Sequence, residues 1–220
     1  HVEGKVDPVA DAETIETELM LADIESIEKR LQNLSRKIRG GEKEAVEQDR
    51  LLRLALGVLE NGQPARTLNI VEEDFRTWDM LQLLTAKPIL YVCNVDEEKA
   101  ASGNTYSEAV EKMAKTHGAA SVVISAAIEE EISQLESEEA NMFLEEMGLD
   151  QPGLNKLIEA GYDLLELQTY FTCGPKETRA WTIPRETIAP KAASVIHTDF
   201  EKGFIRAETI SYDDFISFQG

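Results

Sequence analysis

The chain has 220 residues, with 42 acidic and 22 basic side chains and a formal net charge of −20, which disfavours nucleic acid as a partner for the chain as a whole. Its apolar content of 42% excludes a disordered chain. No apolar run approaches the length of a membrane span, and two cysteines are too few for a disulfide framework, so we expect a cytoplasmic protein without membrane contact.

Two long helices are predicted in the first third of the chain. The first, over residues 11–38, has apolar residues at alternating steps of four and three, which is typical of a coiled-coil seam. The seam residues are Met20, Ile24, Ile27, Leu31, Leu34 and Ile38. Gly40 and Gly41 end this helix, and a second helix follows over residues 42–60. We expect an antiparallel hairpin and a monomer; dimerisation through the seam is the alternative.

Basic residues gather near the turn between these helices. Residues 29–53 contain eight basic and four acidic side chains, net +4, whereas residues 96–166 have a net charge of −13. A basic patch on an acidic body can direct a phosphate backbone to one face. The candidates for RNA contact are Arg36, Lys37, Arg39 and Lys43. A solvated helix surface is the alternative, and charge alone favours it.

From Arg66 to Gln168 the pattern alternates between strand and helix, which indicates an α/β fold. The predicted strands are Arg66–Ile70, Ile89–Cys93 and Ala120–Ser125, and the predicted helices are Glu72–Leu84, Ser107–His117 with a Thr105-x-x-Glu108 capping box, acidic helices up to Met147, and a helix from Pro152 to Gln168. The unbroken apolar run Ile89–Cys93 is typical of a strand buried on both faces.

The last quarter of the chain has a different residue pattern. Short β-branched and aromatic runs, separated by Gly and Pro, predict the strands of a small β-rich domain. These runs are Thr169–Cys173, Arg179–Ile183, Ala193–His197 and Phe204–Ile210.

A ligand site is predicted where two neighbouring strands end. Asn94-x-x-Glu97 follows the first buried strand, and Ser125-Ala126-Ala127 follows the next. Because ligands bind beyond the carboxyl ends of strands in open α/β sheets, the two loops are placed to hold a flat heterocycle. The alternative is purely structural, with Asn94 capping the turn and Glu97 starting a helix.

No catalytic residue can be nominated from the sequence. The closest approach to a phosphate-binding P-loop, Gly57 to Pro64, lacks the lysine and the hydroxyl. The three histidines are widely spaced and have no neighbouring ligands for zinc, and no Ser-His-Asp or Cys-His arrangement is present.

Several segments in order resemble the YchF family of Obg-like P-loop NTPases. They include Leu83 to Glu97 (LLTAKPILYVCNVDE), Pro152 to Asn155 (PGLN), Leu167 to Thr172 (LQTYFT), Arg179 to Ile183 (RAWTI) and Ile196 to Arg206 (IHTDFEKGFIR). The resemblance runs essentially from end to end, so the combination is specific where any one motif would be weak.

The resemblance implies a P-loop NTPase G-domain with a parallel sheet, interrupted by an inserted antiparallel helical hairpin and followed by a ubiquitin-like β-grasp domain, the TGS domain. The implied G-domain segments are 1–11 and 69–167, the insertion is 12–68, and the TGS domain is 168–220. The P-loop, the switch regions and the ligands of Mg²⁺ would precede His1, and the TGS domain would continue past Gly220.

The resemblance also implies a role for the two loops. Asn94, Val95 and Glu97 would belong to the N-x-x-E loop that recognises the nucleotide base, and Ser125 and Ala126 to the loop that closes over it. In ordinary GTPases this loop reads N-K-x-D, and its aspartate accepts the N1–H of guanine. With Glu97 and Val95 in place of aspartate and lysine, we expect ATP to bind at least as well as GTP.

Two functions follow. The first is a Mg²⁺-dependent ATPase or GTPase that switches an association with the ribosome, with its phosphate chemistry outside these residues. The second is a non-catalytic module that docks on ribosome or RNA through the basic hairpin and the TGS domain.

Overall fold

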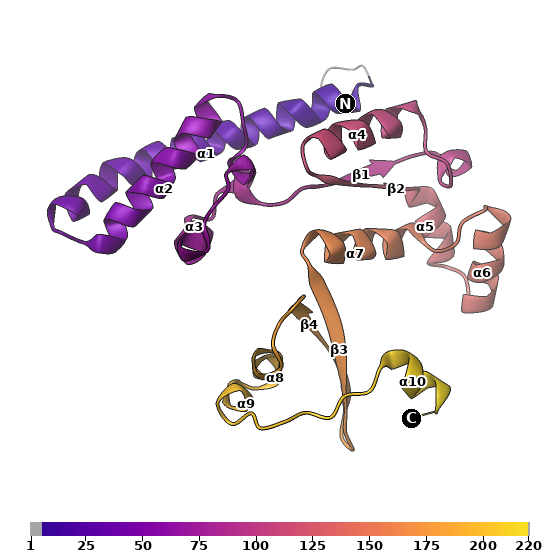
Figure 1. Cartoon of the computed structure of the whole chain (residues 1–220). Coiled ribbons are helices and arrows are strands. Elements are labelled where there is room, and N and C mark those ends of the chain that lie inside the picture. The colour runs from indigo at the N-terminus through magenta and orange to yellow at the C-terminus, as the bar shows by residue number, and fades with distance from the viewer. Residues whose placement is uncertain (1–5, 220) are drawn as a thin grey trace. The chain divides into compact units, whose positions relative to one another are not determined.

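The computed structural model describes residues 6–219. Residues 1–5 of the first predicted G-domain segment and residue 220 of the predicted TGS domain lie outside the described residues. The chain divides into two compact units, residues 1–160 and 161–220. Figure 1 shows the elements in chain order. Within residues 6–219, no helix has both the length and the apolar character needed to cross a membrane.

The described residues form α-helices, short 3-10 helices and two pairs of strands. The α-helices are α1 (Pro8–Arg39), α2 (Lys43–Glu60), α3 (Phe75–Leu81), α4 (Thr105–Thr116), α5 (Ala126–Ile132), α6 (Ser137–Glu146), α7 (Gly153–Leu164), α8 (Ala189–Ile196), α9 (Thr198–Lys202) and α10 (Tyr212–Ser217). The 3-10 helices are η1 (Ala65–Thr67), η2 (Glu72–Asp74), η3 (Leu84–Ala86) and η4 (Glu97–Lys99). The strands are β1 (Leu90–Asn94), β2 (Ala120–Ile124), β3 (Leu167–Cys173) and β4 (Thr178–Pro184).

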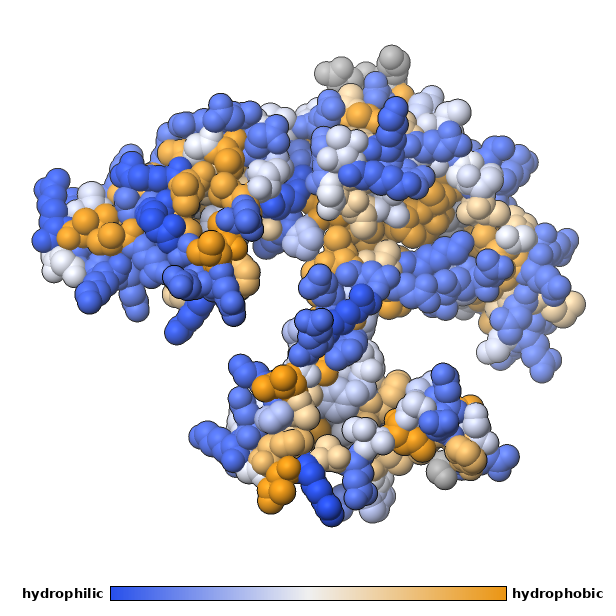
Figure 2. All heavy atoms as spheres, viewed as in Figure 1, coloured by the Kyte–Doolittle hydropathy of each residue, from blue (hydrophilic) through white to orange (hydrophobic). Residues whose placement is uncertain are grey.

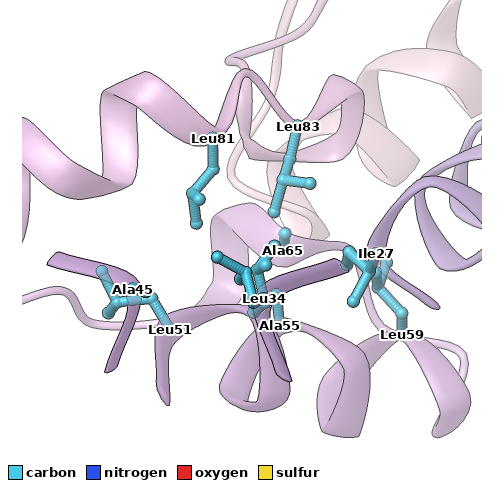
Figure 3. Packing of buried hydrophobic residues seen from close by; sticks show 10 residues of the cluster. Ile27, Leu34, Ala45, Leu51, Ala55, Leu59, Ala65, Leu81 and Leu83 are labelled. Atoms are coloured by element: carbon cyan, nitrogen blue, oxygen red, sulfur yellow. The ribbon is translucent and has the colours of Figure 1, made fainter. Parts of the chain in front are cut away.

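One apolar cluster holds α1 and α2 together. α1 begins where the Asp7 side chain accepts the N–H of Ala10, and the chain reverses at Gly41, which has a φ of 82°. Figure 3 shows Ile27 and Leu34 of α1 among buried side chains of α2 and of the segment that follows it. The remaining residues of the predicted seam are partly buried against the same cluster. Both predicted helices are therefore present, and their apolar faces meet within one chain.

Asp23 fastens this hairpin to the chain that follows it. Its buried carboxylate accepts the N–H of Leu84 at 2.9 Å, and the N–H and hydroxyl of Thr85 at 2.8 and 2.6 Å. The Thr85 hydroxyl in turn accepts the N–H of Ala65 at 3.2 Å. Three segments far apart in sequence thus share one set of buried hydrogen bonds.

The predicted strand Arg66–Ile70 is wrong, and the predicted helix Glu72–Leu84 is shorter than expected. Residues 65–67 form η1 after Pro64, since the Ala65 N–H is bonded to Thr85 instead of to a strand. The second segment becomes η2 and α3, which ends at Gln82 in the left-handed conformation, with a φ of 51°. This turn leaves Leu83 buried in the hairpin cluster.

β1 and β2 pair in parallel, with Leu90 opposite Ala120 and Asn94 opposite Ile124. The connection between them contains α4, which packs against both strands (Figure 1), so the predicted α/β class is confirmed at this level. The prediction that β1 is buried on both faces is wrong. Val92 is 45% exposed, because none of the described elements fully covers its side chain on that face of the sheet.

The cap of α4 differs from the predicted Thr105-x-x-Glu108 box. The Asn104 side chain accepts the N–H groups of Tyr106 and Ser107, and the Ser107 hydroxyl accepts the N–H of Asn104. Asn is a stronger N-cap than Thr, so the reciprocal pair forms one residue earlier.

After β2, acidic helices α5 and α6 lead to a turn at Gly148, which has a φ of 68°, as the sequence predicts. The helix expected to reach Gln168 is α7, and it ends at Leu164. Glu166 takes a positive φ of 51° and turns the chain into β3, where Gln168 pairs with Ile183. Strand pairing thus decides the end of this helix.

In the second unit, β3 and β4 form an antiparallel pair and contain the predicted strands Thr169–Cys173 and Arg179–Ile183. The predicted strand Ala193–His197 is wrong, because residues 189–196 form α8 with Pro190 in its first turn. Its alanines favour a helix over the strand preference of Val195 and Ile196. Phe204–Ile210 is also not a strand and has no pairing partner within the described part of this unit.

The Asp23 contacts predict a large loss of stability in an Asp23→Ala variant. Two buried donors and one part-buried donor would lose a charged acceptor, and we expect the free energy of unfolding to fall by about 3 kcal/mol. Urea denaturation measures this. Glu25→Ala removes an exposed carboxylate from the same helix and is expected to change stability little; equal losses in the two variants would contradict the anchoring role of Asp23.

Candidate functional site

The candidate ligand site lies where β1 and β2 end side by side. The N–H of Val95 donates to the carbonyl of Ile124 at 2.9 Å, which extends the parallel pairing by one bond. One step further, the Oδ1 of Asn94 accepts the N–H of Ala126 at 2.9 Å. The two predicted loops are therefore joined directly, and Asn94 is the side chain that joins them.

A cavity of about 480 Å³ opens beside this bond. Its lining comes from the loop after β1 and from the start of α5: Asn94, Val95, Asp96, Glu97, Glu98 and Ala127. Asn94, Val95 and Glu97 are thus brought together as the sequence predicts. The sequence prediction of the site does not include Asp96 and Glu98, which belong to the same loop and also line the cavity.

The second predicted loop contributes differently from the first. The Ser125 side chain is 3% exposed and does not line the cavity, and its hydroxyl has no hydrogen-bond partner in the described part of the chain. The N–H of Ala126 is engaged by Asn94. Val95 as a whole is 8% exposed, and its N–H is bonded to Ile124, so its carbonyl is the polar group that it could offer a ligand.

The charge of the cavity restricts what it can hold. Asp96, Glu97 and Glu98 supply three carboxylates, and no Lys or Arg is among the residues that line it. A phosphate group would be repelled there. A neutral heterocycle with N–H donors matches the carboxylate and carbonyl acceptors, and the amide nitrogen of Asn94, which has no partner within residues 6–219, can donate to a ring nitrogen.

A polar cluster connects β1 to the hairpin. The hydroxyl of Tyr91, three residues before Asn94, donates to Glu16 of α1, and Arg66 donates to the same carboxylate at 2.7 Å. Burial alone would raise the pKa of Glu16, but the hydrogen bonds from Tyr91 and Arg66 outweigh it and lower that pKa. Burial and the Glu16 carboxylate raise the pKa of Tyr91.

Residues 6–219 contain no group of three or more His, Cys, Asp or Glu side chains that could hold a metal ion. Burial raises the pKa of the Cys93 thiol, which keeps it protonated and unreactive. His117 and His197 lie on different units.

The predicted basic residues surround the hairpin turn. Arg36, Lys37 and Arg39 occupy the last turn of α1, and Lys43 starts α2. All four are exposed, and none has a salt-bridge partner among residues 6–219. By contrast, Arg50 and Arg53 are paired with Asp74 and Asp49. Apart from Lys29 and Arg30, the cations of residues 29–53 that have no salt bridge within the described chain thus lie at the tip.

Comparisons with known proteins give relatives that match along the whole chain. A family model described as "Protein of unknown function (DUF933)", YchF-GTPase_C, matches residues 167–220. The "Ribosome-binding ATPase YchF" of Haemophilus influenzae is 49% identical over 220 residues, which are 100% of this chain and 60% of that protein. The protein of the same description from Bacillus subtilis is 47% identical over 219 residues, 99% of this chain and 60% of its own length.

A solved structure agrees with these sequence matches. The Schizosaccharomyces pombe YchF GTPase superposes with a TM-score of 0.81 at 36% identity, and the match covers 100% of this chain and 60% of the other. The chain therefore spans about 60% of the length of the relatives that it matches.

The Glu16 cluster predicts a pH-dependent effect of Tyr91→Phe. Because the folded-state pKa of Glu16 is lowered from 4.5, its contribution to stability is present above that value and is lost as the pH falls through the folded-state pKa. At neutral pH we expect the variant to lose about 2 kcal/mol of unfolding free energy, and the loss to shrink in acid.

Urea denaturation across pH measures this difference. Tyr106→Phe removes the hydroxyl of an exposed tyrosine on α4 and is the matched control, expected to be neutral throughout. A Tyr91→Phe loss that stays constant down to the acid limit would contradict the role of the Glu16 charge.

Proposed function

Because the chain belongs to the YchF family, we propose that it recognises the base of a nucleotide within a switch that binds and hydrolyses ATP, with GTP as a second ligand, and associates with the ribosome. The observation that carries the proposal is the bond between Asn94 and the Ala126 N–H beside an acid-lined cavity. It supports a site for the base and excludes this cavity as a site for the phosphates.

The same bond favours adenine over guanine. Guanine carries an oxygen at C6 that needs a donor, whereas adenine carries an amino group that needs an acceptor. The Ala126 N–H is already taken by Asn94, so it is not available to that oxygen. The adenine amino group would find the acceptors of the loop, including the backbone carbonyl of Val95, while the Asn94 amide donates to the purine N7.

Phosphate binding, hydrolysis and the ligands of Mg²⁺ are assigned to the part of the relatives that these 220 residues do not match. Mg²⁺ would neutralise the charge of the phosphates there. Under this assignment residues 1–11 and 69–167 contribute to the G-domain, residues 12–68 are its helical insertion, and residues 168–220 contribute to a β-grasp TGS domain. We also propose that the protein is cytoplasmic, where ribosomes are found, and monomeric, since the seam of α1 packs within the hairpin.

The second candidate function is a non-catalytic module that docks on ribosome or RNA. The observation that favours it is the set of four exposed, unpaired cations at the hairpin tip in a strongly acidic protein. Net acidity would repel a phosphate backbone from the rest of the surface and direct it to this tip. The two functions are compatible, and separate variants distinguish them.

Glu97→Asp tests base recognition. We expect the intact protein to bind ATP at least as tightly as GTP, and the shortened carboxylate, closer to the N-K-x-D loop of GTPases, to shift the ratio of affinities toward GTP by about tenfold. Titration calorimetry with both nucleotides measures the ratio. Glu98→Asp, in the same cavity, is the control; clearly tighter GTP binding by the unmodified protein would contradict the proposed preference.

Replacing Arg36, Lys37, Arg39 and Lys43 by Gln tests the tip. We expect weaker ribosome or RNA binding and a salt dependence reduced by about three in slope, because fewer counterions are released, with nucleotide turnover nearly unchanged. The matched control replaces four exposed lysines elsewhere: Lys87, Lys99, Lys112 and Lys191. Equal losses of ribosome or RNA binding in the two variants would mean that the tip makes no specific contact and is an ordinary solvated surface.

A further inference from the structure

A groove of about 240 Å³ lies between the hairpin and α3. α1, α2 and α3 all contribute to its lining, which consists of Arg30, Asn33, Leu34, Lys37, Gln48, Leu52, Met80 and Leu81. The groove is separate from the cavity beside Asn94, with which it shares no residue. All of it belongs to the first unit.

The floor of the groove is apolar, and its rim is polar. Leu34 and Leu81 are buried members of the hairpin cluster (Figure 3), and Leu52 belongs to the same cluster. Met80 is 61% exposed although it lines the groove. Figure 2 shows orange residues enclosed by blue ones along the hairpin, in keeping with this alternation of apolar and polar surface. A flexible exposed Met next to an apolar floor is a surface that adapts to a ligand.

The charge of the rim is opposite to that of the whole protein. The chain has 42 acidic residues, yet no carboxylate is among the residues that line the groove, which contains Arg30 and Lys37. One guanidinium nitrogen of Arg30 donates to the Leu81 carbonyl at 2.6 Å, which fixes this cation at the end of α3. Its other N–H groups have no partner within residues 6–219. The rim therefore complements an anionic ligand.

Two side-chain amides in the lining of the groove can form hydrogen bonds with a nucleotide base. Asn33 and Gln48 each offer a donor and an acceptor, and such side chains pair with the edges of unstacked bases. Lys37 belongs both to the groove and to the basic tip, so a strand bound at the tip passes the groove. A duplex keeps its bases stacked and could not place one there.

We propose that this groove binds an unpaired RNA nucleotide, with the base on the aliphatic floor against Met80 and the backbone phosphate beside Lys37 and Arg30. The inference rests on the proposed docking of the hairpin on RNA, and it adds a preference for single-stranded RNA at a defined place. An acidic peptide is the competing ligand, which lacks base edges for Asn33 and Gln48.

Met80→Glu in the intact protein tests the groove without touching the four residues of the tip. Binding of a short fluorescent oligouridine is expected to weaken by about tenfold, the usual effect of losing one base contact, while binding of an RNA duplex of the same length stays within about twofold. Met142→Glu places the same charge at a comparably exposed Met, 72% exposed on α6, and is expected to change neither. Met80→Leu is expected to retain binding.

Two results would overturn the groove as a nucleotide site. The first is a loss of specificity: Met80→Glu and Met142→Glu weaken oligouridine binding equally, or Met80→Glu weakens the binding of single-stranded and duplex RNA to the same extent. In the second, polyglutamate displaces oligouridine as well as unlabelled RNA does, which would indicate a site for acidic peptides. Photocrosslinking of 4-thiouridine RNA to the unmodified protein is the independent measurement, with adducts expected on residues 30–37 or 75–81.

The tip variant separates failure of this inference from failure of the proposed function. If the tip variant abolishes RNA binding while Met80→Glu leaves the single-strand preference intact, docking stands and the groove is excluded. If the tip variant leaves RNA binding intact, the docking role itself is wrong, and the groove proposal falls with it.

Discussion

The parallel register of β1 and β2 determines where every candidate base-binding group of the first unit lies. With Asn94 opposite Ile124, both strands end at the same edge, and the next residues of each can bond across the gap. The Val95 N–H and the Asn94 side chain make these bonds. A shift of one residue would turn Asn94 to the other face of the sheet, because side chains alternate along a strand. The site is thus a consequence of strand pairing and does not depend on a flexible loop.

Residue patterns predict the secondary structure correctly where the burial of apolar side chains alone decides it. The 4-3 spacing of α1 and the alternation from strand to helix report which side chains leave water, and the structure buries Ile27 and Leu34 accordingly. The pairing of loops at the carboxyl strand ends also followed from topology. The patterns failed where two local preferences compete. Val195 and Ile196 prefer strands, but Pro190 and the surrounding alanines start and sustain a helix. At α4, Asn104 displaces the adjacent Thr105 as cap.

Other details depend on contacts that no local pattern contains. Asp23 reaches a segment 61 and 62 residues away, and this pairing makes Ala65 part of a turn instead of a strand. The burial of Ser125 and the engagement of the Ala126 N–H likewise follow from the neighbouring loop. The strand-end pattern therefore predicts which residues lie at the candidate ligand site, whereas the hydrogen bond that Asn94 accepts from Ala126 depends on the three-dimensional structure.

The contact with the hairpin and the candidate ligand site lie on opposite faces of β1. Tyr91 and Asn94 differ by an odd number of positions, so their side chains leave β1 in opposite directions. Tyr91 contacts Glu16 of α1, and Asn94 contacts Ala126. The contact with the hairpin therefore does not occupy the ligand edge, yet both ends of this short path are fixed by hydrogen bonds to the same five-residue strand. A displacement of β1 by a bound base would act directly on Glu16 and hence on α1, whose far end has the basic tip. The contact with the hairpin and the candidate ligand site therefore share β1 but use different faces of it.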